Sequence, residues 1–187
     1  MIPPLSTNAA PTKRAGIKNL ILGSGGARRL PDGYDNEKAK TEFALLAKKM
    51  AINARKQGIT IILENLNNTE TNFINKLKDA ADVVRAVNHP NFKLNADIYH
   101  MMKEGESPQE IVNARGLLIY SEIVEVEQRT LPGVVKENFI PYLQALKAIN
   151  FKGPILIEGR SQNLQKDVPN AYVYLTNQLK AAYSKTK

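Results

Sequence analysis

The sequence repeats one pattern four times, a short apolar run that ends on a carboxylate. The runs cover residues 61–63, 92–96, 117–121 and 155–157, and the acids that follow them are Glu64, Asp97, Glu122 and Glu158. Each run is too short for a helix and is typical of a buried strand. Successive acids lie 33, 25 and 36 residues apart, a spacing that fits one strand, one helix and their loops. A parallel sheet or barrel would therefore gather the four carboxylates at one edge.

Helical patterns separate these strands. Residues 37–57 carry an apolar stripe at helical spacing, and further helices are expected from about 74 to 87, at 137–149 and at 168–183. With a first strand within 16–23, five strands alternate with helices, which indicates an α/β fold with parallel pairing. A closed barrel of eight such units needs about 250 residues. We therefore predict a partial, incomplete TIM barrel, with residues 1–187 as a single domain and 1–14 as an irregular N-terminal segment.

The composition limits the chemistry of any bound ion. The chain has no cysteine and two histidines, His89 and His100, so oxygen atoms must supply most ligands. Oxygen ligands favour magnesium or manganese, with cobalt as a further candidate. The convergence of the four carboxylates thus predicts a divalent metal site.

Charge and hydropathy restrict the partners and the location. The net charge is +8, but lysines and arginines are scattered between acids, and no basic block contains interleaved aromatic residues. Nucleic acid is therefore an unlikely partner. No apolar stretch approaches the about 20 residues of a membrane span, and the N-terminus lacks the features of a secretory signal. We expect a cytoplasmic protein with no membrane partner.

A glycine-rich loop, Gly-Ser-Gly-Gly-Ala-Arg-Arg, follows the first strand at residues 23–29. It lacks the third glycine of a dinucleotide-binding fingerprint. Two interpretations remain open from the sequence. The loop could bind an anion through its backbone amides, or its glycines could allow close packing in a tight turn.

Five short motifs together resemble the sugar phosphate isomerase/epimerase family, the xylose isomerase-like TIM barrels. They are Gly-Ser-Gly-Gly-Ala-Arg at 23–28, Leu-Glu-Asn-Leu-Asn at 63–67 followed by Glu-Thr-Asn-Phe at 70–73, Asp-Ile-Tyr-His-Met at 97–101, Arg-Thr-Leu-Pro-Gly at 129–133 and Ile-Glu-Gly at 157–159. Ketose 3-epimerases, hydroxypyruvate isomerases and inosose dehydratases belong to this family. The resemblance covers about residues 12–162 and corresponds to the family's C-terminal half, from its fourth strand to its eighth.

The resemblance implies a function and a set of site residues. Glu64, Asp97 and Glu158 would bind a divalent metal, and Glu64 and Glu158 would also form the acid/base pair. His100 and Arg129 would hold oxygens of the substrate, a small ketose or sugar phosphate. The implied reaction is proton transfer next to a carbonyl, which gives epimerisation or isomerisation.

The sequence departs from the family pattern in two ways. The histidine expected on the seventh strand is missing, and the alignment puts either Glu122 or Ile123 in its place. Glu122 would complete a site of carboxylates alone, whereas Ile123 would leave three ligands. The family's first three strands are also not found, so a homo-oligomer or a second chain is expected to cover the open sheet edges. Both departures lead us to expect impaired catalysis.

Two alternative functions belong to other classes. The first is an inactive remnant of such an enzyme that acts as a binding or structural protein. The second is a phosphodiesterase similar to endonuclease IV, which would suit the basic charge. That site holds three zinc ions and needs several histidines, which His89 and His100 cannot supply.

Overall fold

Five parallel strands form one sheet in the computed structural model, which describes residues 15–184. The strand order is β1-β2-β3-β4-β5, so each strand pairs with the strand that precedes it in the chain. Their bounds are Asn19–Leu22 (β1), Thr60–Glu64 (β2), Phe92–Asp97 (β3), Leu118–Ile123 (β4) and Ile155–Ile157 (β5). The expected partial TIM barrel with five parallel strands is confirmed.

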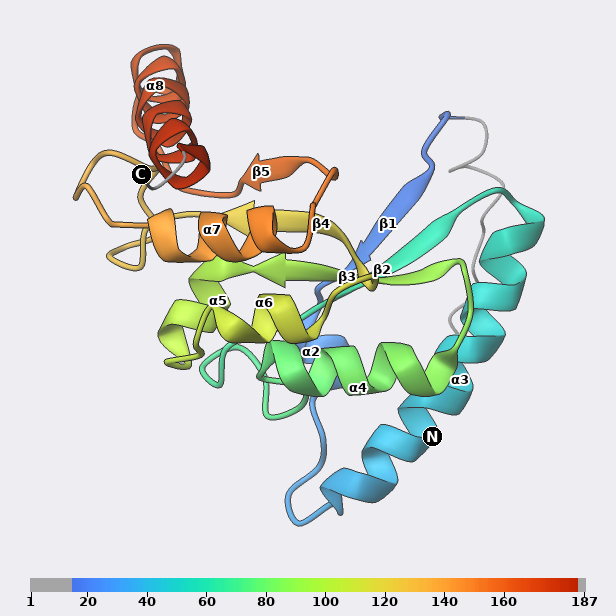
Figure 1. Ribbon diagram of the computed structural model, residues 1–187. Helices are drawn as coiled ribbons and strands as arrows, with labels where there is room; N and C mark the ends of the chain where they lie inside the picture. The colour runs from blue at the N-terminus through green and yellow to red at the C-terminus, as the bar shows by residue number, and fades with distance from the viewer. Residues whose placement is uncertain (1–14, 185–187) are drawn as a thin grey trace.

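Helices follow the strands and cover one face of the sheet (Figure 1). Neighbouring helices pack in chain order, with α3 on α4, α4 on α6, α6 on α7 and α7 on α8. This right-handed alternation of strand and helix is the usual connection between parallel strands. The bounds are Gly25–Arg28 (α2), Asn36–Lys56 (α3), Leu77–Val87 (α4), Ile98–Lys103 (α5), Gln109–Asn113 (α6), Ile140–Ala148 (α7) and Leu164–Tyr183 (α8).

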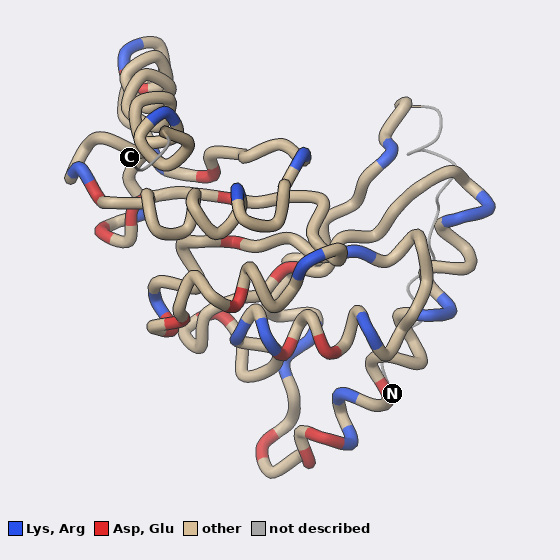
Figure 2. Tube along the Cα trace, in the orientation of Figure 1, with Lys and Arg blue, Asp and Glu red and all other residues tan. Residues whose placement is uncertain are grey.

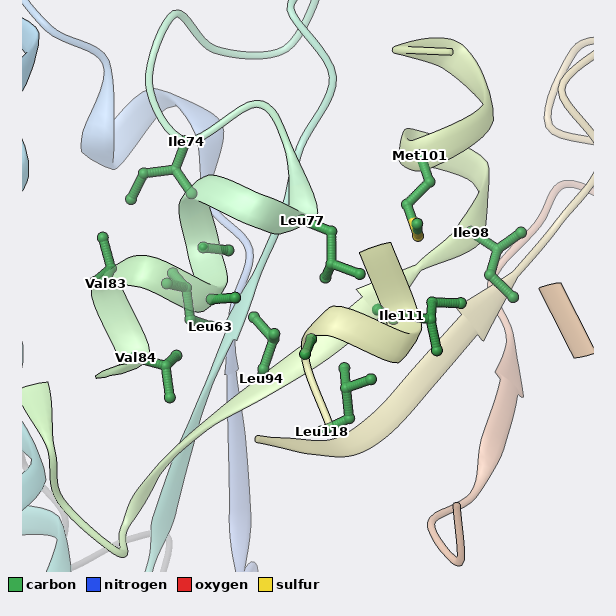
Figure 3. Close-up of a cluster of buried hydrophobic side chains, with 14 of the residues drawn as sticks. Leu63, Ile74, Leu77, Val83, Val84, Leu94, Ile98, Met101, Ile111 and Leu118 are labelled. Carbon is green, nitrogen blue, oxygen red and sulfur yellow. The ribbon is translucent and has the colours of Figure 1, made fainter. Parts of the chain in front are cut away.

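The hydrophobic core lies between the sheet and the helices. Leu63 and Leu94 from neighbouring strands contribute to it, together with Leu77 of α4 and Ile111 of α6 (Figure 3). Alternate strand residues point to the opposite, concave face. On that face the Asn19 amide of β1 donates a hydrogen bond to the Tyr120 hydroxyl of β4 at 3.1 Å. The sheet is therefore curved enough for side chains of non-adjacent strands to meet.

Three helices differ in extent from the sequence prediction. α4 begins at Leu77 rather than at about 74, because Ile74 has a left-handed backbone conformation with φ of 60°. α8 begins at Leu164, four residues before the expected start, because the Asn163 side chain caps it by accepting a hydrogen bond from the Lys166 amide. α7 begins at Ile140 rather than 137, since a side chain of α8 forms hydrogen bonds with the preceding backbone. There, Gln178 of α8 accepts from the Phe139 amide and donates to the carbonyl oxygen of Glu137, each at 2.7 Å.

Apolar side chains are exposed at both ends of the sheet. On the edge strand β1, Leu20 and Ile21 are about two-fifths exposed, and Leu164, Val168 and Tyr172 form an exposed stripe along α8. That a second copy or another chain covers these surfaces stays a prediction, as does the irregular segment 1–14, which lies outside the described residues. Between residues 15 and 184, no helix has the length and apolar character needed to cross a membrane.

Charged residues of both signs share the helical surface. Lysines, arginines and acids are interleaved along α4 and the first half of α3, whereas the second half of α3 carries basic charges alone (Figure 2). Ion pairs such as Lys78–Asp82 at 2.9 Å and Arg85–Asp82 at 2.8 Å use part of this charge locally. The surface of α4 therefore lacks the continuous positive field that would attract a polyanion.

We expect Leu94→Ala to lower the free energy of unfolding by about 3 kcal/mol, because Leu94 is fully buried and its truncation leaves a cavity. Leu45→Ala is the matched control, since Leu45 is 62% exposed on α3; its effect should stay within about 0.5 kcal/mol. Urea unfolding of both variants measures the difference. Equal effects would contradict the described core.

Candidate functional site

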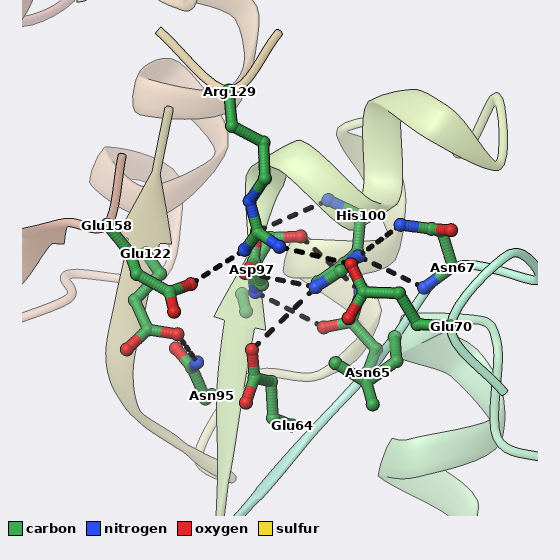
Figure 4. A network of polar contacts seen from close by, with 12 residues as sticks. Glu64, Asn65, Asn67, Glu70, Asn95, Asp97, His100, Glu122, Arg129 and Glu158 are labelled. Carbon is green, nitrogen blue, oxygen red and sulfur yellow. Dashed lines mark hydrogen bonds and ion pairs between the residues drawn. The ribbon is translucent and has the colours of Figure 1, made fainter. Parts of the chain in front are cut away.

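Four carboxylates meet at the carboxyl-terminal edge of the sheet (Figure 4). Glu64, Asp97, Glu122 and Glu158 each offer an oxygen, and these oxygens all lie within 4.8 Å of one another. Asp97 is paired in register with Glu122, and Glu64 with Asn95, which puts these side chains on the same concave face. The expected convergence is therefore confirmed, and its geometry could hold one cation.

The structure decides between the two residues that could replace the missing histidine. Ile123 is fully buried in the hydrophobic core on the helix side of the sheet. Glu122 points to the opposite side, into the carboxylate group, because side chains alternate along a strand. There it accepts a hydrogen bond from the buried amide of Asn95. Glu122 therefore takes the place next to the other three acids.

Burial and mutual repulsion perturb the titration of Glu64, Asp97 and Glu122. Desolvation is the main cause that raises the pKa of Glu64, and the negative charges of Asp97, Glu122 and Glu158 raise it further. Desolvation also raises the pKa of Asp97 and of Glu122 above the usual range of carboxyl groups. Three buried acids crowded together beside the exposed Glu158 are unfavourable unless a proton or a cation compensates their charge.

His100 lies beside the acids as a neutral donor. Its Nδ1 atom accepts a hydrogen bond from the Asn67 backbone amide at 3.0 Å, so the ring proton is on Nε2. Burial and the positive charge of Arg129 lower the pKa of His100 to about 3. Nε2 is 3.5 Å from Asp97 Oδ2 and 3.8 Å from Glu64 Oε1, yet it makes no hydrogen bond within the described part of the chain. A buried N–H group can thus donate at the site.

Arg129 lies at the edge of the carboxylate group. Its guanidinium donates to Glu158 Oε2 at 2.9 Å and to Glu70 Oε1 at 3.1 Å, and it lies 4.6 Å from the centre of the Tyr99 ring. These contacts join the loops that follow β2, β4 and β5, which are distant from one another in the sequence. We did not predict a role for Glu70, although it belongs to the continuation of the family motif that begins at Leu63. Its pairing with Arg129 brings its carboxylate to the edge of the site.

Glu125 anchors the loop that carries Arg129. Its fully buried carboxylate accepts hydrogen bonds from the backbone amides of Gly133 and Val135, both at 2.7 Å, and from the Thr130 hydroxyl at 2.9 Å. The loop needs this support because Arg129 itself has a left-handed backbone conformation, with φ of 55°. We did not single out Glu125 in the sequence, where it is one of several acids in a polar loop.

The glycine loop after β1 is explained by close packing. A Cβ atom on Gly23 would lie 1.8 Å from Glu64 Oε2, and one on Gly25 would lie 2.6 Å from the carbonyl oxygen of Glu70. Any side chain at either position would displace an acid of the site or its loop. Of the two interpretations left open by the sequence, the structure therefore supports the close approach of the backbone.

Comparison with known proteins places the chain in a family. The family model described as xylose isomerase-like TIM barrel matches residues 9–179. The chain belongs to this family, as its motifs and its parallel sheet with carboxylates at the strand ends had indicated.

Among curated proteins, the chain is similar to sugar epimerases. It is 33% identical over 117 residues to the L-ribulose 3-epimerase of Methylomonas sp. (strain DH-1), a match that covers 62% of this chain and 41% of that protein. It is 30% identical to the ketose 3-epimerase of Arthrobacter globiformis, with 62% and 40% covered. The chain thus matches about two-fifths of the length of these relatives.

Solved structures share the fold. An L-ribulose 3-epimerase structure superimposes with a TM-score of 0.76 at 21% identity and covers 96% of this chain and 69% of that one. The IOLI protein with a bound zinc atom gives a TM-score of 0.79 at 19% identity, with 95% and 68% covered. At these identities the likeness concerns the fold.

The raised pKa values predict that stability without metal falls with increasing pH. The acids titrate near pH 4 in the unfolded chain and at higher pH when folded. The folded state therefore binds more protons between these values, and its stability decreases from about pH 5 to pH 8. Urea unfolding in a chelator measures this slope. Glu64→Gln removes one titrating group and should make the slope shallower, and an unchanged slope would contradict the assignment.

Gly23→Ala should destabilise the protein by about 1–3 kcal/mol, because the new methyl group overlaps the Glu64 carboxylate in a packed region. Gly26→Ala is the matched control in the same loop, since a Cβ atom there meets nothing within 4 Å. Thermal unfolding of the two variants at one pH gives the comparison. If Gly23→Ala were as stable as the control, the close approach to Glu64 would not exist in solution.

Proposed function

We propose that the protein is a divalent-metal-dependent isomerase or epimerase that acts on a small ketose or sugar phosphate. The observation that carries this proposal is the group of four carboxylates within 4.8 Å, with the N–H group of His100 directed at it and unpaired among the described residues. The names of the curated relatives, L-ribulose 3-epimerase and ketose 3-epimerase, support the same class of reaction and substrate.

The donor atoms fit a divalent cation. Glu64, Asp97 and Glu158 would hold the ion together with Glu122, and a cation would offset the desolvation and the mutual repulsion that raise the pKa of Glu64. Carboxylate oxygens suit magnesium and manganese, with cobalt as a third candidate. The IOLI protein, which has the same fold and binds a zinc atom, supports the presence of a metal.

The proposed reaction moves a proton next to a carbonyl. When bound, a divalent ion would supply the positive charge that polarises the substrate carbonyl and so acidifies the adjacent C–H group. Of the pair Glu64 and Glu158, one carboxylate removes this proton and the other returns a proton. Return to the opposite face of the same carbon gives epimerisation, and return to the neighbouring carbon gives isomerisation.

His100 and Arg129 hold the substrate oxygens. The Nε2–H group of His100 has no partner among the described residues, so a hydroxyl or carbonyl oxygen placed between it and the acids would accept its hydrogen bond. Arg129 can donate to a second oxygen while its contacts with Glu70 and Tyr99 keep the guanidinium in position. Orientation of this kind matters because a misplacement of about 1 Å can cost about 100-fold in rate.

The phosphodiesterase alternative finds less support. His89 precedes β3 and so lies at the other end of this strand from Asp97, where its Nδ1 atom accepts a hydrogen bond from the Asn91 amide. Of the two histidines in the sequence, His100 alone therefore lies near the acids, which is too few for a cluster of three zinc ions. The inactive remnant stays as the alternative that the experiment below must exclude, and the cytoplasmic location stays a prediction.

Proton abstraction is measured most directly by deuterium exchange. The protein is incubated with Mn²⁺ and a panel of ketoses and ketose phosphates in deuterated water, and deuterium at the reacting carbon is followed by NMR. We expect slow Mn²⁺-dependent exchange with at least one substrate, because the absence of the first three strands and of the ligand histidine should impair catalysis. Glu158→Gln and Glu64→Gln should each reduce it by at least about 100-fold, the usual size of an acid/base contribution.

Glu127→Gln is the matched control, because Glu127 is an exposed acid in the loop after β4. It should leave the exchange unchanged. Exchange that persists in both Glu64→Gln and Glu158→Gln would refute the assigned pair. If Mn²⁺ neither binds nor supports exchange, the protein is the inactive remnant instead.

A further inference from the structure

We propose that the metal centre is made of oxygen ligands alone and that Asn95 holds Glu122 in place for it. Such a centre shifts the preference of the protein toward Mg²⁺ and Mn²⁺ and away from Zn²⁺ and Co²⁺. The inference rests on the proposed function, since it concerns the ion of the same site, and it selects among the ions proposed there.

His100, with Glu64 and Asp97, forms a second group of side chains close enough to hold an ion, but the hydrogen bonds of His100 argue against a nitrogen ligand. His100 is the histidine nearest them, and its Nδ1 atom already accepts from the backbone amide and lies 2.8 Å from the side-chain amide nitrogen of Asn67. Its Nε2 atom then carries the proton and has no lone pair to offer a metal. The sequence contains no cysteine. His100 therefore acts toward the site as a hydrogen-bond donor rather than as a ligand.

Asn95 fixes the position of Glu122 through one hydrogen bond. Both side chains lie on the concave face, and the register between β3 and β4 sets Asp97 beside Glu122, with Asn95 two residues earlier on the same strand. The Asn95 amide nitrogen donates to Glu122 Oε2. Asn95 is fully buried and Glu122 is 6% exposed, so water competes little for this contact.

The choice of ion follows from this donor set. Mg²⁺ and Mn²⁺ are matched to carboxylate oxygens, whereas Zn²⁺ and Co²⁺ gain additional affinity from an imidazole nitrogen. Zn²⁺ binds more tightly than Mg²⁺ to most protein sites. The quantity that reports the donor set is therefore the dissociation constant for Mg²⁺ divided by the dissociation constant for Zn²⁺. With carboxylates only, this ratio is smaller than in a site of the same geometry that includes one histidine.

Asn95 is a positioning residue, since it contacts a ligand and not the ion. Hydrogen bonds to metal ligands commonly contribute about 10–100-fold to metal affinity. Loss of the Asn95 amide would leave Glu122 free to turn away from the other acids. The effect should fall on metal binding more than on folding, because the strand itself is held by its backbone pairing with β2 and β4.

Titration calorimetry of the metal-free protein with Mg²⁺, Mn²⁺, Co²⁺ and Zn²⁺ tests the inference without any measurement of activity. We expect Glu122→His to increase the preference for Zn²⁺ over Mg²⁺ by at least about tenfold relative to wild type. Asn95→Ala should weaken Mg²⁺ binding by at least about tenfold. Glu127→His is the matched control, because it adds a histidine at an exposed position and should change neither value.

Each outcome has a separate meaning. An unchanged preference in Glu122→His, or unchanged Mg²⁺ affinity in Asn95→Ala, would overturn the inference while leaving a metal-dependent enzyme possible. If the wild-type protein binds none of the four ions, the proposed function fails as well. Circular dichroism establishes that the variants fold. Should Glu122→His not fold, Glu122→Gln keeps the shape and an oxygen donor, and unchanged Mg²⁺ affinity in that variant would likewise overturn the inference.

Discussion

Repulsion between buried carboxylates is the constraint on which the rest of this site depends. Parallel strands end at one edge of the sheet, so an acid after each strand is brought close to the others. Glu64 and Asp97 are almost completely buried there, and the pKa of each is raised mainly by desolvation. A fold that holds these groups together at neutral pH is unfavourable without a compensating cation, which makes the arrangement informative about function.

A shell of neutral contacts holds the acids in this unfavourable position. The side chain of Asn65 bridges the ends of β2 and β3, with its amide donating to the Asp97 carbonyl at 3.3 Å and its oxygen accepting from the Asp97 amide at 3.2 Å. Asn67 orients His100, and Asn95 orients Glu122. Amide side chains can do this without adding charge, and each supports a group that would otherwise rotate away from its neighbours.

Sequence reasoning predicted the strands well and the loops poorly. The runs that end at Glu64, Asp97 and Glu158 could be found because a buried strand leaves a compact apolar signal. Glu70 and Glu125 were missed because their importance comes from partners far along the chain or from backbone amides of a folded loop. The start of α8 was also misjudged, since the Asn163 cap lies upstream of the expected start at residue 168.

The sequence by itself determined the class of fold, the family and the spacing that brings four acids to one edge, because these depend on periodicity and order along the chain. Only the tertiary structure decided between Glu122 and Ile123, since strand alternation and register settle which side chain faces the site. It likewise decided which ring nitrogen of His100 carries the proton, and it explained why residue 23 is a glycine. These features depend on distances between atoms that are remote in sequence, and such distances exist only once the sheet has formed.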